Sequence, residues 1–203
     1  MIYLKFKYVI DLIAAIIFIL ILSPLIIFIS LVIKLNLGSP IFFTQIRPGL
    51  NEKKFRLIKF RTMSFKKDTS GKLLKDQYRL TKLGRFLRET SIDELPTLIN
   101  IIRGEMSFIG PRPLLVEYLN LYSTYEKKRH NVKPGLTGMA QINGRNSITW
   151  KKKFDYDIFY TNNISLFLDI KILFITIFKV IKKEGIYSKY NIPIEPFKGH
   201  DNS

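Results

Sequence analysis

The sequence predicts a mainly α-helical protein with a small β-hairpin, held to a membrane by a re-entrant N-terminal helix and by amphipathic helices on the membrane surface. Three observations support this fold class. An almost unbroken apolar run extends from Tyr8 to Ile33, two segments of strand formers bracket a turn between residues 40 and 60, and apolar residues recur at helical spacing farther along the chain. The 203 residues contain no long linker, so we expect a single domain spanning 1–203.

The overall charge indicates what the chain contacts. Its formal net charge is +17, which predicts a negatively charged partner. Because 47% of the residues are apolar and 13% are aromatic, the chain differs from a solvated basic tail, and we expect anionic membrane lipids rather than nucleic acid as that partner. The chain has no cysteine, which excludes disulfides, thiolate metal sites and cysteine nucleophiles and fits a reducing cytoplasm.

The apolar run allows three interpretations. A secretory signal would be shorter and would end at a small-residue cleavage site, which the sequence lacks near Leu35 to Ser39. A single transmembrane helix needs about twenty apolar residues, which the run supplies. However, Ser23-Pro24 lies at its middle, where proline should bend the helix while the serine satisfies a freed backbone group.

The bend favours the third interpretation, a re-entrant helix-break-helix at 1–36. An arm of about fifteen residues rises only about 23 Å, which is too short for a hydrocarbon layer about 30 Å thick. Lysines precede the run, and lysines and an arginine follow it, so the positive-inside rule places both ends in the cytoplasm. We expect a body at 37–185 and a C-terminal tail at 186–203.

The body begins with the predicted hairpin. Strand formers at 40–45 and 54–60 flank the turn-forming residues 47–51. Residues 64–77 are polar and predict an exposed excursion from the core. From residue 78 to residue 88, leucines recur at helical spacing beside a row of basic residues, which predicts a helix with an apolar and a cationic face.

Another helix is expected from about Ser165 to Lys183, with most of its surface apolar and lysines along one edge. It either packs against the core or lies in the plane of an anionic membrane interface. The tail beyond Gly185 has no clear period, and we expect little regular structure there. His130 lies in the basic run Lys128–Asn131, which predicts an exposed, solvated histidine.

The acidic pair Asp93-Glu94 is the strongest candidate for chemistry. Ser91 and Glu94 match a helix capping box, which is a purely structural alternative. Pro96 instead favours a helix that begins near Asp93, because proline is tolerated in the first turn. The helix dipole and Arg88 would then favour an ionised Asp93, open to solvent. Adjacent carboxylates suit either a nucleophile that attacks phosphorus or ligands for a divalent cation.

Two turn-rich loops, at residues 133–138 and 141–145, are explained equally well as structural turns and as backbone that wraps a phosphate group.

Several motifs occur in order along the chain, and together they carry a resemblance. They are Ser23-Pro24, Phe43-Thr44-Gln45-Ile46-Arg47-Pro48-Gly49, Lys59-Phe60-Arg61-Thr62-Met63, Asp93-Glu94-Leu95-Pro96, Met106-Ser107-Phe108-Ile109-Gly110-Pro111-Arg112-Pro113, Lys133-Pro134-Gly135-Leu136-Thr137-Gly138 and Gln141-Ile142-Asn143-Gly144-Arg145. In these motifs, which cover almost the whole chain, the protein resembles the small monotopic phosphoglycosyl transferases, the bacterial sugar transferases of the PglC type.

The resemblance implies a two-step reaction on the cytoplasmic face of the bacterial inner membrane, the first membrane step of glycoconjugate biosynthesis. Asp93 attacks the β-phosphorus of a UDP-sugar, UMP departs, and the phosphosugar-aspartyl enzyme gives its sugar phosphate to undecaprenyl phosphate. Asp93 also binds Mg²⁺, and Glu94 is the second catalytic residue, as a general base or an orienting group. The residues that the resemblance assigns to substrate phosphate binding are Lys59, Arg88, Arg112 and Arg145, with Asp157 as a positioning partner for one of these cations.

Alternatives remain at the level of function and of substrate. A membrane-anchored basic scaffold without catalysis would need only the charge and the amphipathic helices. Within the enzyme class, similarity to the small PglC-type members favours an N-acetylated or diacetamido UDP-sugar, and transfer of a hexose phosphate without an acetamido group is the alternative. The sequence carries no indication of oligomeric state.

Overall fold

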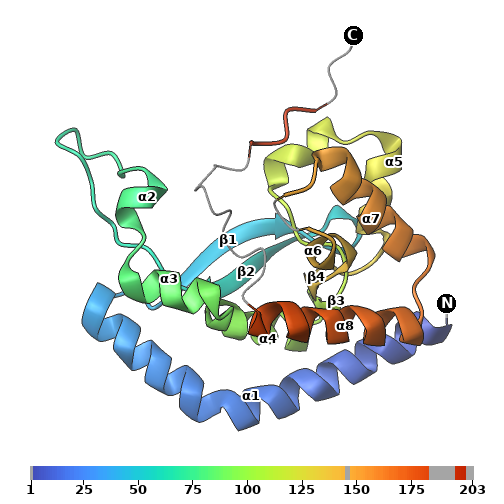
Figure 1. Ribbon diagram of the computed structural model, residues 1–203, viewed down its shortest axis with the longest axis horizontal. Helices are drawn as coiled ribbons and strands as arrows, with labels where there is room; N and C mark the ends of the chain where they lie inside the picture. Colours follow the sequence, from blue (N-terminus) through green and yellow to red (C-terminus); the bar gives the residue numbers. More distant parts are fainter. Residues whose placement is uncertain (1, 145–146, 183–194, 200–203) are drawn as a thin grey trace.

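The computed structural model describes residues 2–144, 147–182 and 195–199, arranged as Figure 1 shows. The protein is mostly helical with one antiparallel hairpin, which confirms the predicted fold class. The strands are β1 (Phe42–Pro48), β2 (Lys54–Phe60), β3 (Ser107–Ile109) and β4 (Gly135–Thr137). The α-helices are α1 (Ile2–Leu37), α2 (Asp76–Arg79), α3 (Lys82–Glu89), α4 (Leu98–Ile102), α5 (Thr124–Lys127), α6 (Met139–Ile142), α7 (Trp150–Asn162) and α8 (Leu166–Ile181). The 3-10 helices are η1 (Leu50–Glu52), η2 (Ile92–Thr97), η3 (Val116–Leu121) and η4 (Lys128–Asn131).

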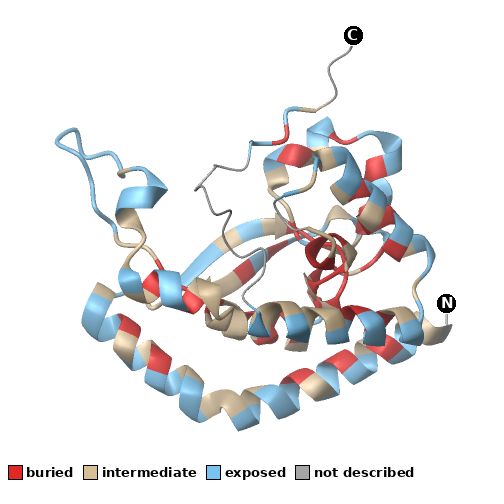
Figure 2. Cartoon of the chain, in the orientation of Figure 1, coloured by how far each residue is buried: buried red, intermediate tan, exposed pale blue. Residues whose placement is uncertain are grey.

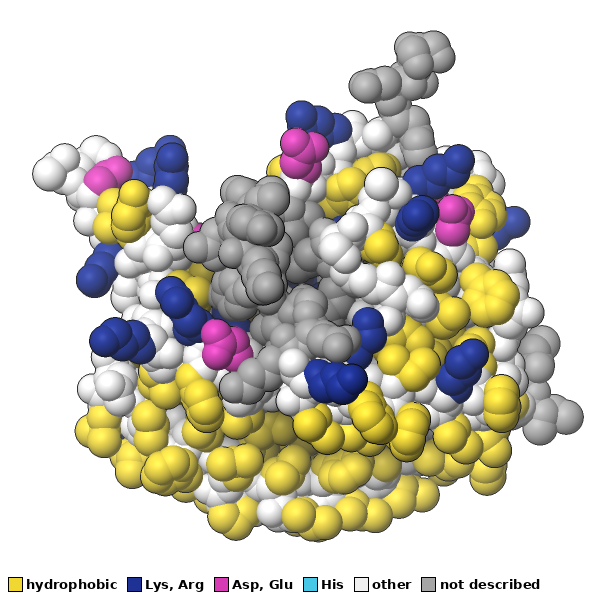
Figure 3. Space-filling model, in the orientation of Figure 1, with side chains coloured by type: hydrophobic (Ala, Val, Ile, Leu, Met, Phe, Trp, Pro, Cys, Tyr) yellow, Lys and Arg dark blue, Asp and Glu magenta, His cyan; other side chains and the backbone are white. Residues whose placement is uncertain are grey.

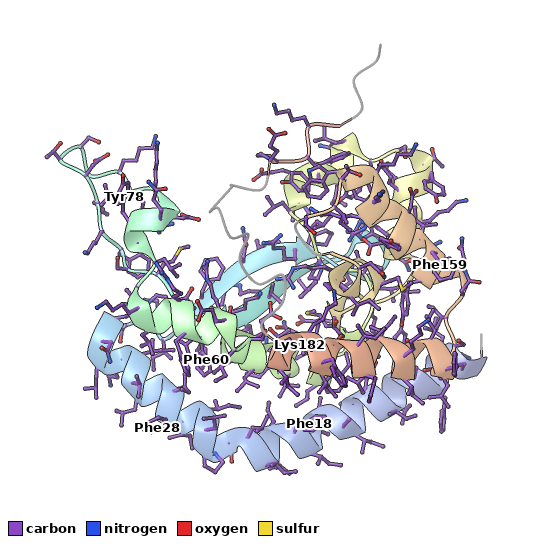
Figure 4. The ribbon with its side chains drawn as sticks, in the orientation of Figure 1. Phe18, Phe28, Phe60, Tyr78, Phe159 and Lys182 are labelled. Carbon is purple, nitrogen blue, oxygen red and sulfur yellow. The ribbon has the colours of Figure 1, made fainter. Side chains whose placement is uncertain are left out.

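The first helix, α1, is continuous and bowed at its middle (Figure 1). Pro24 has no N–H for the carbonyl of Leu20, four residues earlier, and the Ser23 hydroxyl donates a hydrogen bond to that carbonyl at 2.8 Å. The predicted break is therefore a bend within an uninterrupted helix, because Ser23 replaces the lost bond. Phe18 and Phe28 lie on the two arms, on either side of the bend (Figure 4). Among the described residues, α1 alone is long and apolar enough to cross a membrane.

A buried polar network fixes the N-terminal arm of α1 to the body. Lys7 Nζ lies 2.9 Å from Asp169 Oδ2 on α8 and 3.6 Å from Asp11 Oδ2. The Ser107 hydroxyl donates to Asp11 at 2.5 Å, and the Tyr160 hydroxyl donates to Asp169 at 2.7 Å. Because residues four apart share a helix face, Lys7 and Asp11 point into the body together.

The C-terminal end of α1 is held by Arg61, which directly follows β2. Its guanidinium donates hydrogen bonds to the carbonyls of Leu37 at 2.6 Å, Gly38 at 2.5 Å and Ser39 at 3.2 Å. The last carbonyls of a helix lack partners inside the helix and attract a cation. Polar contacts therefore attach both ends of α1 to the body, and Ala15 and Ile19 nearer the bend pack against α4.

The predicted hairpin is confirmed. β1 and β2 pair antiparallel, from Phe42 opposite Phe60 to Pro48 opposite Lys54. A second, parallel pairing of β3 with β4 was not predicted. It depends on close backbone contact, because a Cβ on Gly110 would lie 2.4 Å from the carbonyl oxygen of Lys133, closer than side chains tolerate.

The helix predicted at 78–88 is divided in two, α2 and α3. Thr81 stands between them in extended conformation, and its side chain accepts a hydrogen bond from Gly84 N, which begins α3. A threonine N-cap of this kind starts a new helix, and the leucine spacing alone did not show it. The excursion at 64–77 is largely exposed, as predicted, and Tyr78 lies at its end (Figures 2 and 4).

Helix α8 turns a broad apolar face outwards. Phe167 is 79% exposed and Ile181 is 74% exposed, whereas Asp169 and Ile172 are its buried residues. The exposed apolar side chains of α1 and α8 gather on one side of the molecule, with Lys and Arg along the border (Figure 3). This exposure favours the membrane-interface interpretation of α8 over the core-packing one.

The prediction that His130 is exposed and solvated was wrong. Arg129 is 2% exposed and His130 is 5% exposed, because η4 packs under α7 and the Arg129 guanidinium lies over the ring of Phe154. Burial, together with the charge of Arg129, lowers the pKa of His130 to about 4. His130 is thus neutral at pH 7 and is a packed side chain rather than a solvated one.

Candidate active site

Asp93 and Glu94 lie in the first turn of η2. Ser91 precedes the helix in the left-handed conformation, with φ at 58°, and its side chain makes no cap hydrogen bond among the described residues. The capping-box alternative is therefore wrong, and the Glu94 side chain instead pairs with Lys59 and Arg112. Ile92 and Leu95 pack against an apolar cluster that includes Ile29 and Ile33 of α1, so the acidic pair lies next to a cluster that α1 helps to form.

Glu94 is fixed between two cations. Its Oε1 atom lies 2.5 Å from Lys59 Nζ on β2 and 3.0 Å from Arg112 Nη2, in the loop after β3. Burial by itself would raise the pKa of Glu94, but the charges and hydrogen bonds of Lys59 and Arg112 outweigh it and lower that pKa to about 2. Glu94 is therefore anionic at neutral pH, which suits an orienting group better than a general base.

Asp93 has the opposite environment. It is only 9% exposed, which corrects the expectation of a carboxylate open to solvent, and within the described part of the chain its carboxylate has no hydrogen bond or ion pair. Burial, followed by the nearby charge of Glu94, raises the pKa of Asp93 to about 6, against the opposing charges of Lys59, Arg88 and Arg112. Asp93 is still mainly ionised at pH 7, but it is less strongly so than the predicted helix dipole implied.

The remaining predicted residues are partly brought together. Lys59 and Arg112 contact Glu94 directly, and Arg88 is held beside the pair by a hydrogen bond from its Nε to the Thr62 hydroxyl at 2.9 Å. Arg112 is 48% exposed and is therefore available to a substrate. Arg145 lies outside the described residues.

Asp157 is buried on α7 and reaches the site only indirectly. Its Oδ2 atom accepts hydrogen bonds from Arg129 Nη2 at 2.6 Å and Nε at 3.0 Å. Arg129 Nη2 also donates to the backbone carbonyl of Arg112 at 2.7 Å. The cation that Asp157 pairs with is thus Arg129 and not one of the predicted phosphate-binding residues, because no local sequence pattern links two residues that lie this far apart.

The family whose sequence profile matches this chain is described as bacterial sugar transferases, and the match covers residues 2–183. This chain belongs to that family. The sugar transferase EpsL of Bacillus subtilis is 52% identical to this sugar transferase, over 95% of the present chain and 96% of EpsL. The exopolysaccharide production protein ExoY of Rhizobium meliloti is 38% identical over 87% of the chain and 86% of ExoY.

A longer relative carries an activity in its name. The UDP-glucose:undecaprenyl-phosphate glucose-1-phosphate transferase of Klebsiella pneumoniae is 38% identical over 90% of this sugar transferase, which aligns with 41% of that protein. The present chain thus spans about two fifths of that relative. The shared part contains the whole described site.

The donor set of this sugar transferase fits a divalent cation bound together with a substrate. Among the described residues there is no cluster of three or more acidic or histidine side chains that could hold a metal ion alone. Mg²⁺ is commonly held by one or two carboxylates plus substrate phosphate oxygens, and Asp93 is the carboxylate left unpaired. The surface hollows on α8 and beside η4 do not include Asp93 or Glu94.

Proposed function

We propose that this sugar transferase transfers a sugar 1-phosphate from a UDP-sugar to undecaprenyl phosphate and releases UMP, through a covalent phosphosugar intermediate on Asp93. The observation that carries the proposal is the contrast between two adjacent carboxylates. Glu94 is fixed by Lys59 and Arg112, whereas Asp93 is free of partners among the described residues. Neighbouring carboxyl groups whose pKa values diverge in this way have different roles in catalysis.

In the first step, an Asp93 carboxylate oxygen attacks the β-phosphorus of the UDP-sugar. A new P–O bond forms to Asp93 as the bond to the bridging oxygen breaks, and that oxygen leaves with UMP. The transferred group carries negative charge that must be neutralised, and Lys59, Arg88 and Arg112 supply the positive charge. Glu94 holds Lys59 and Arg112 in place while they do so. Mg²⁺ bound by Asp93 and the substrate phosphates would add further charge neutralisation.

In the second step, a phosphate oxygen of undecaprenyl phosphate attacks the same phosphorus. The P–O bond to Asp93 breaks, the carboxylate is regenerated, and the product is an undecaprenyl diphosphate sugar. Because one phosphorus is attacked twice, donor and acceptor react in turn at a single carboxylate, and ping-pong kinetics are expected.

The position of the acidic pair supports an acceptor that resides in a membrane. Its helix η2 packs against an apolar cluster that includes Ile29 and Ile33 of α1, and the exposed apolar surfaces of α1 and α8 share one side of the molecule (Figure 3). We infer that α1 enters and leaves the bilayer on the cytoplasmic face of the inner membrane. The bend at Pro24 and the attachment of both ends of α1 to the body support this monotopic arrangement.

Two classes of UDP-sugar are candidates for the donor. An N-acetylated or diacetamido UDP-sugar follows from the likeness to small PglC-type enzymes. A hexose without an acetamido group follows from the glucose 1-phosphate transferase named among the relatives. A panel of UDP-sugars separates them in one experiment.

The deciding experiment measures UMP release by the purified full chain with undecaprenyl phosphate, Mg²⁺ and each UDP-sugar. We expect one class of sugar to support release, and mass spectrometry of protein incubated without acceptor to show a phosphosugar on Asp93. Asp93→Asn should abolish both while retaining membrane association. No release with any UDP-sugar, or release that persists in Asp93→Asn, would refute the proposal, and the first outcome would favour the scaffold.

A further inference from the structure

The side of η2 and α4 that meets β2 carries polar side chains at intervals of three, Glu94, Thr97 and Asn100. In a 3-10 helix, residues i and i+3 lie on the same side, so Glu94 and Thr97 point in the same direction. Asn100 reaches the same strand from α4. Of these three residues, only Glu94 was predicted from the sequence to belong to the site.

Thr97 and Asn100 bond to the edge of β2 that faces away from β1. Asn100 Oδ1 accepts a hydrogen bond from Ile58 N at 3.0 Å, and its Nδ2 donates to the Arg56 carbonyl at 2.8 Å. The Thr97 hydroxyl donates to the Ile58 carbonyl at 2.9 Å. The side chains thus take the place of a neighbouring strand, which would otherwise satisfy these backbone groups.

Both side chains are almost fully enclosed. Asn100 is 0% exposed and Thr97 is 1% exposed, so water does not compete for their hydrogen bonds. A second bond from Asn100 Nδ2, to Glu105 Oε2 at 2.6 Å, fixes the amide orientation. A buried backbone group without a hydrogen-bond partner destabilises the folded protein. Moving β2 away from Thr97 and Asn100 would leave such groups at Arg56 and Ile58, so the strand is held firmly there.

Ile58, the last residue of β2 that these side chains hold, directly precedes Lys59. Side chains alternate between the two faces of a strand, so a shift of β2 by one residue would turn Lys59 away from Glu94. The bond between Lys59 Nζ and Glu94 Oε1, at 2.5 Å, is the next contact along the same interface. A correct register at Ile58 is thus a condition for the contact at Lys59.

We propose that Thr97 and Asn100 are positioning residues that set the distance between Lys59 and the Asp93–Glu94 pair, and so fix the active charge arrangement. This inference rests on the proposed function and adds residues that touch no substrate. The charged groups that face Asp93 are Glu94 on η2, Lys59 on β2, Arg88 on α3 and Arg112 in the loop after β3. Of these, Lys59 is the one whose place depends on β2.

The test compares a substitution of Thr97 that removes the hydroxyl with one that keeps it. Thr97→Val keeps the shape of the side chain and removes the bond to Ile58, whereas Thr97→Ser keeps the bond. Ile101→Val is the matched control, because Ile101 is buried in an apolar cluster on α4 and its trimming affects packing alone. Thr97→Ala replaces Thr97→Val if the latter does not fold.

We expect Thr97→Val to lower kcat for UMP release roughly 10- to 100-fold, with a smaller change in KM, because a small misplacement of catalytic groups has effects of this size. Thr97→Ser should restore kcat. Ile101→Val should lower the melting temperature and leave kcat unchanged.

The inference is overturned if Thr97→Val and Ile101→Val lower kcat equally per folded molecule, or if Thr97→Ser lowers kcat as much as Thr97→Val does. Failure of the proposed function is a separate result, seen as the absence of UMP release in the unsubstituted chain. In that case, a crystal structure of Thr97→Val decides the inference without activity, through the distance between Lys59 Nζ and Glu94 Oε1, which is 2.5 Å in the unsubstituted chain. An unchanged distance would show that Thr97 has a structural role only.

Discussion

Replacing Asp93 by asparagine should make the protein more stable while it removes the proposed activity. The pKa of Asp93 is raised from 3.8 to about 6, chiefly by burial and then by Glu94. A carboxyl group whose pKa is raised on folding binds its proton more tightly in the folded state, so ionisation opposes folding. This destabilisation is complete above the folded pKa and disappears below the unfolded one.

The size of the effect follows from the two pKa values. Proton linkage between 3.8 and about 6 gives about 3 kcal/mol of destabilisation at pH 7 and roughly 0.5 kcal/mol at pH 4. For a protein of about 200 residues, 3 kcal/mol corresponds to a rise of roughly 6–12 °C in melting temperature. Asp93→Asn should therefore raise the free energy of unfolding by about 3 kcal/mol at pH 7 and by little at pH 4.

The adjacent residue supplies a control with the opposite sign. The pKa of Glu94 is lowered from 4.5 to about 2 because Lys59 and Arg112 outweigh its burial, so its charge stabilises the folded state above pH 4.5 and this contribution is lost as pH falls towards 2. Glu94→Gln should lower the free energy of unfolding by about 3 kcal/mol at pH 7. Two isosteric substitutions of neighbouring residues are thus expected to shift stability in opposite directions.

The assay is thermal unfolding of the full chain and both variants in one detergent or nanodisc preparation, at pH 7 and pH 4. The pH dependence isolates the charge, since any packing change from the amide persists at both values. The reasoning is refuted if Asp93→Asn is no more stable than the unsubstituted chain at pH 7, or if its gain is equal at both pH values. A gain at pH 7 together with lost UMP release would show that the site sacrifices stability for an ionised nucleophile.

Three further outcomes are expected. Activity should fall below about pH 6 as Asp93 becomes protonated, because its raised pKa is about 6, and an acid limb near pH 4 would contradict the assignment. Asp157→Asn should destabilise the fold by roughly 3–5 kcal/mol, because it leaves the buried charge of Arg129 without its partner. Asp155 is exposed on the same helix, and Asp155→Asn should leave stability unchanged. Equal melting temperatures for the two variants would contradict this role of the Arg129–Asp157 pair. Ser23→Ala combined with Pro24→Ala should straighten α1 into a span, measured by labelling single introduced cysteines near each end, and two cytoplasmic ends in that variant would defeat the idea.

The sequence predicted features that depend on neighbours in the chain. Proline removes an N–H wherever it stands, so the bend at Pro24 and the help from Ser23 were both foreseeable. The hairpin followed from strand formers around a turn. The division of the 78–88 helix was missed because the capping role of Thr81 is decided by its backbone conformation, and leucine spacing gives no sign of it.

Candidate site residues were predictable only where a motif carried them. Asp93 and Glu94 stand out as an acidic pair, yet their contrasting environments come from Lys59 and Arg112, which lie far away in the sequence. Asn100 was not selected because a polar residue three positions beyond another is ordinary on a helix surface. The burial of Arg129 was missed for a similar reason, since its pairing with Asp157 across 28 positions leaves no local pattern.

Polar contacts at the two ends of α1 decide how this helix is oriented on the body. Lipid tails are as apolar as leucine or isoleucine side chains, so the apolar surface of α1 gains little by leaving lipid for the body, and its orientation must come from packing and hydrogen bonds. The structure supplies such bonds at one end through Lys7 and Asp169, and at the other through Arg61 and the Leu37 carbonyl. Arg61 directly follows the strand that carries Lys59. The attachment of α1 and the placement of Lys59 therefore depend on the same short segment at the end of β2, which links the orientation of the helix to the geometry of the candidate site.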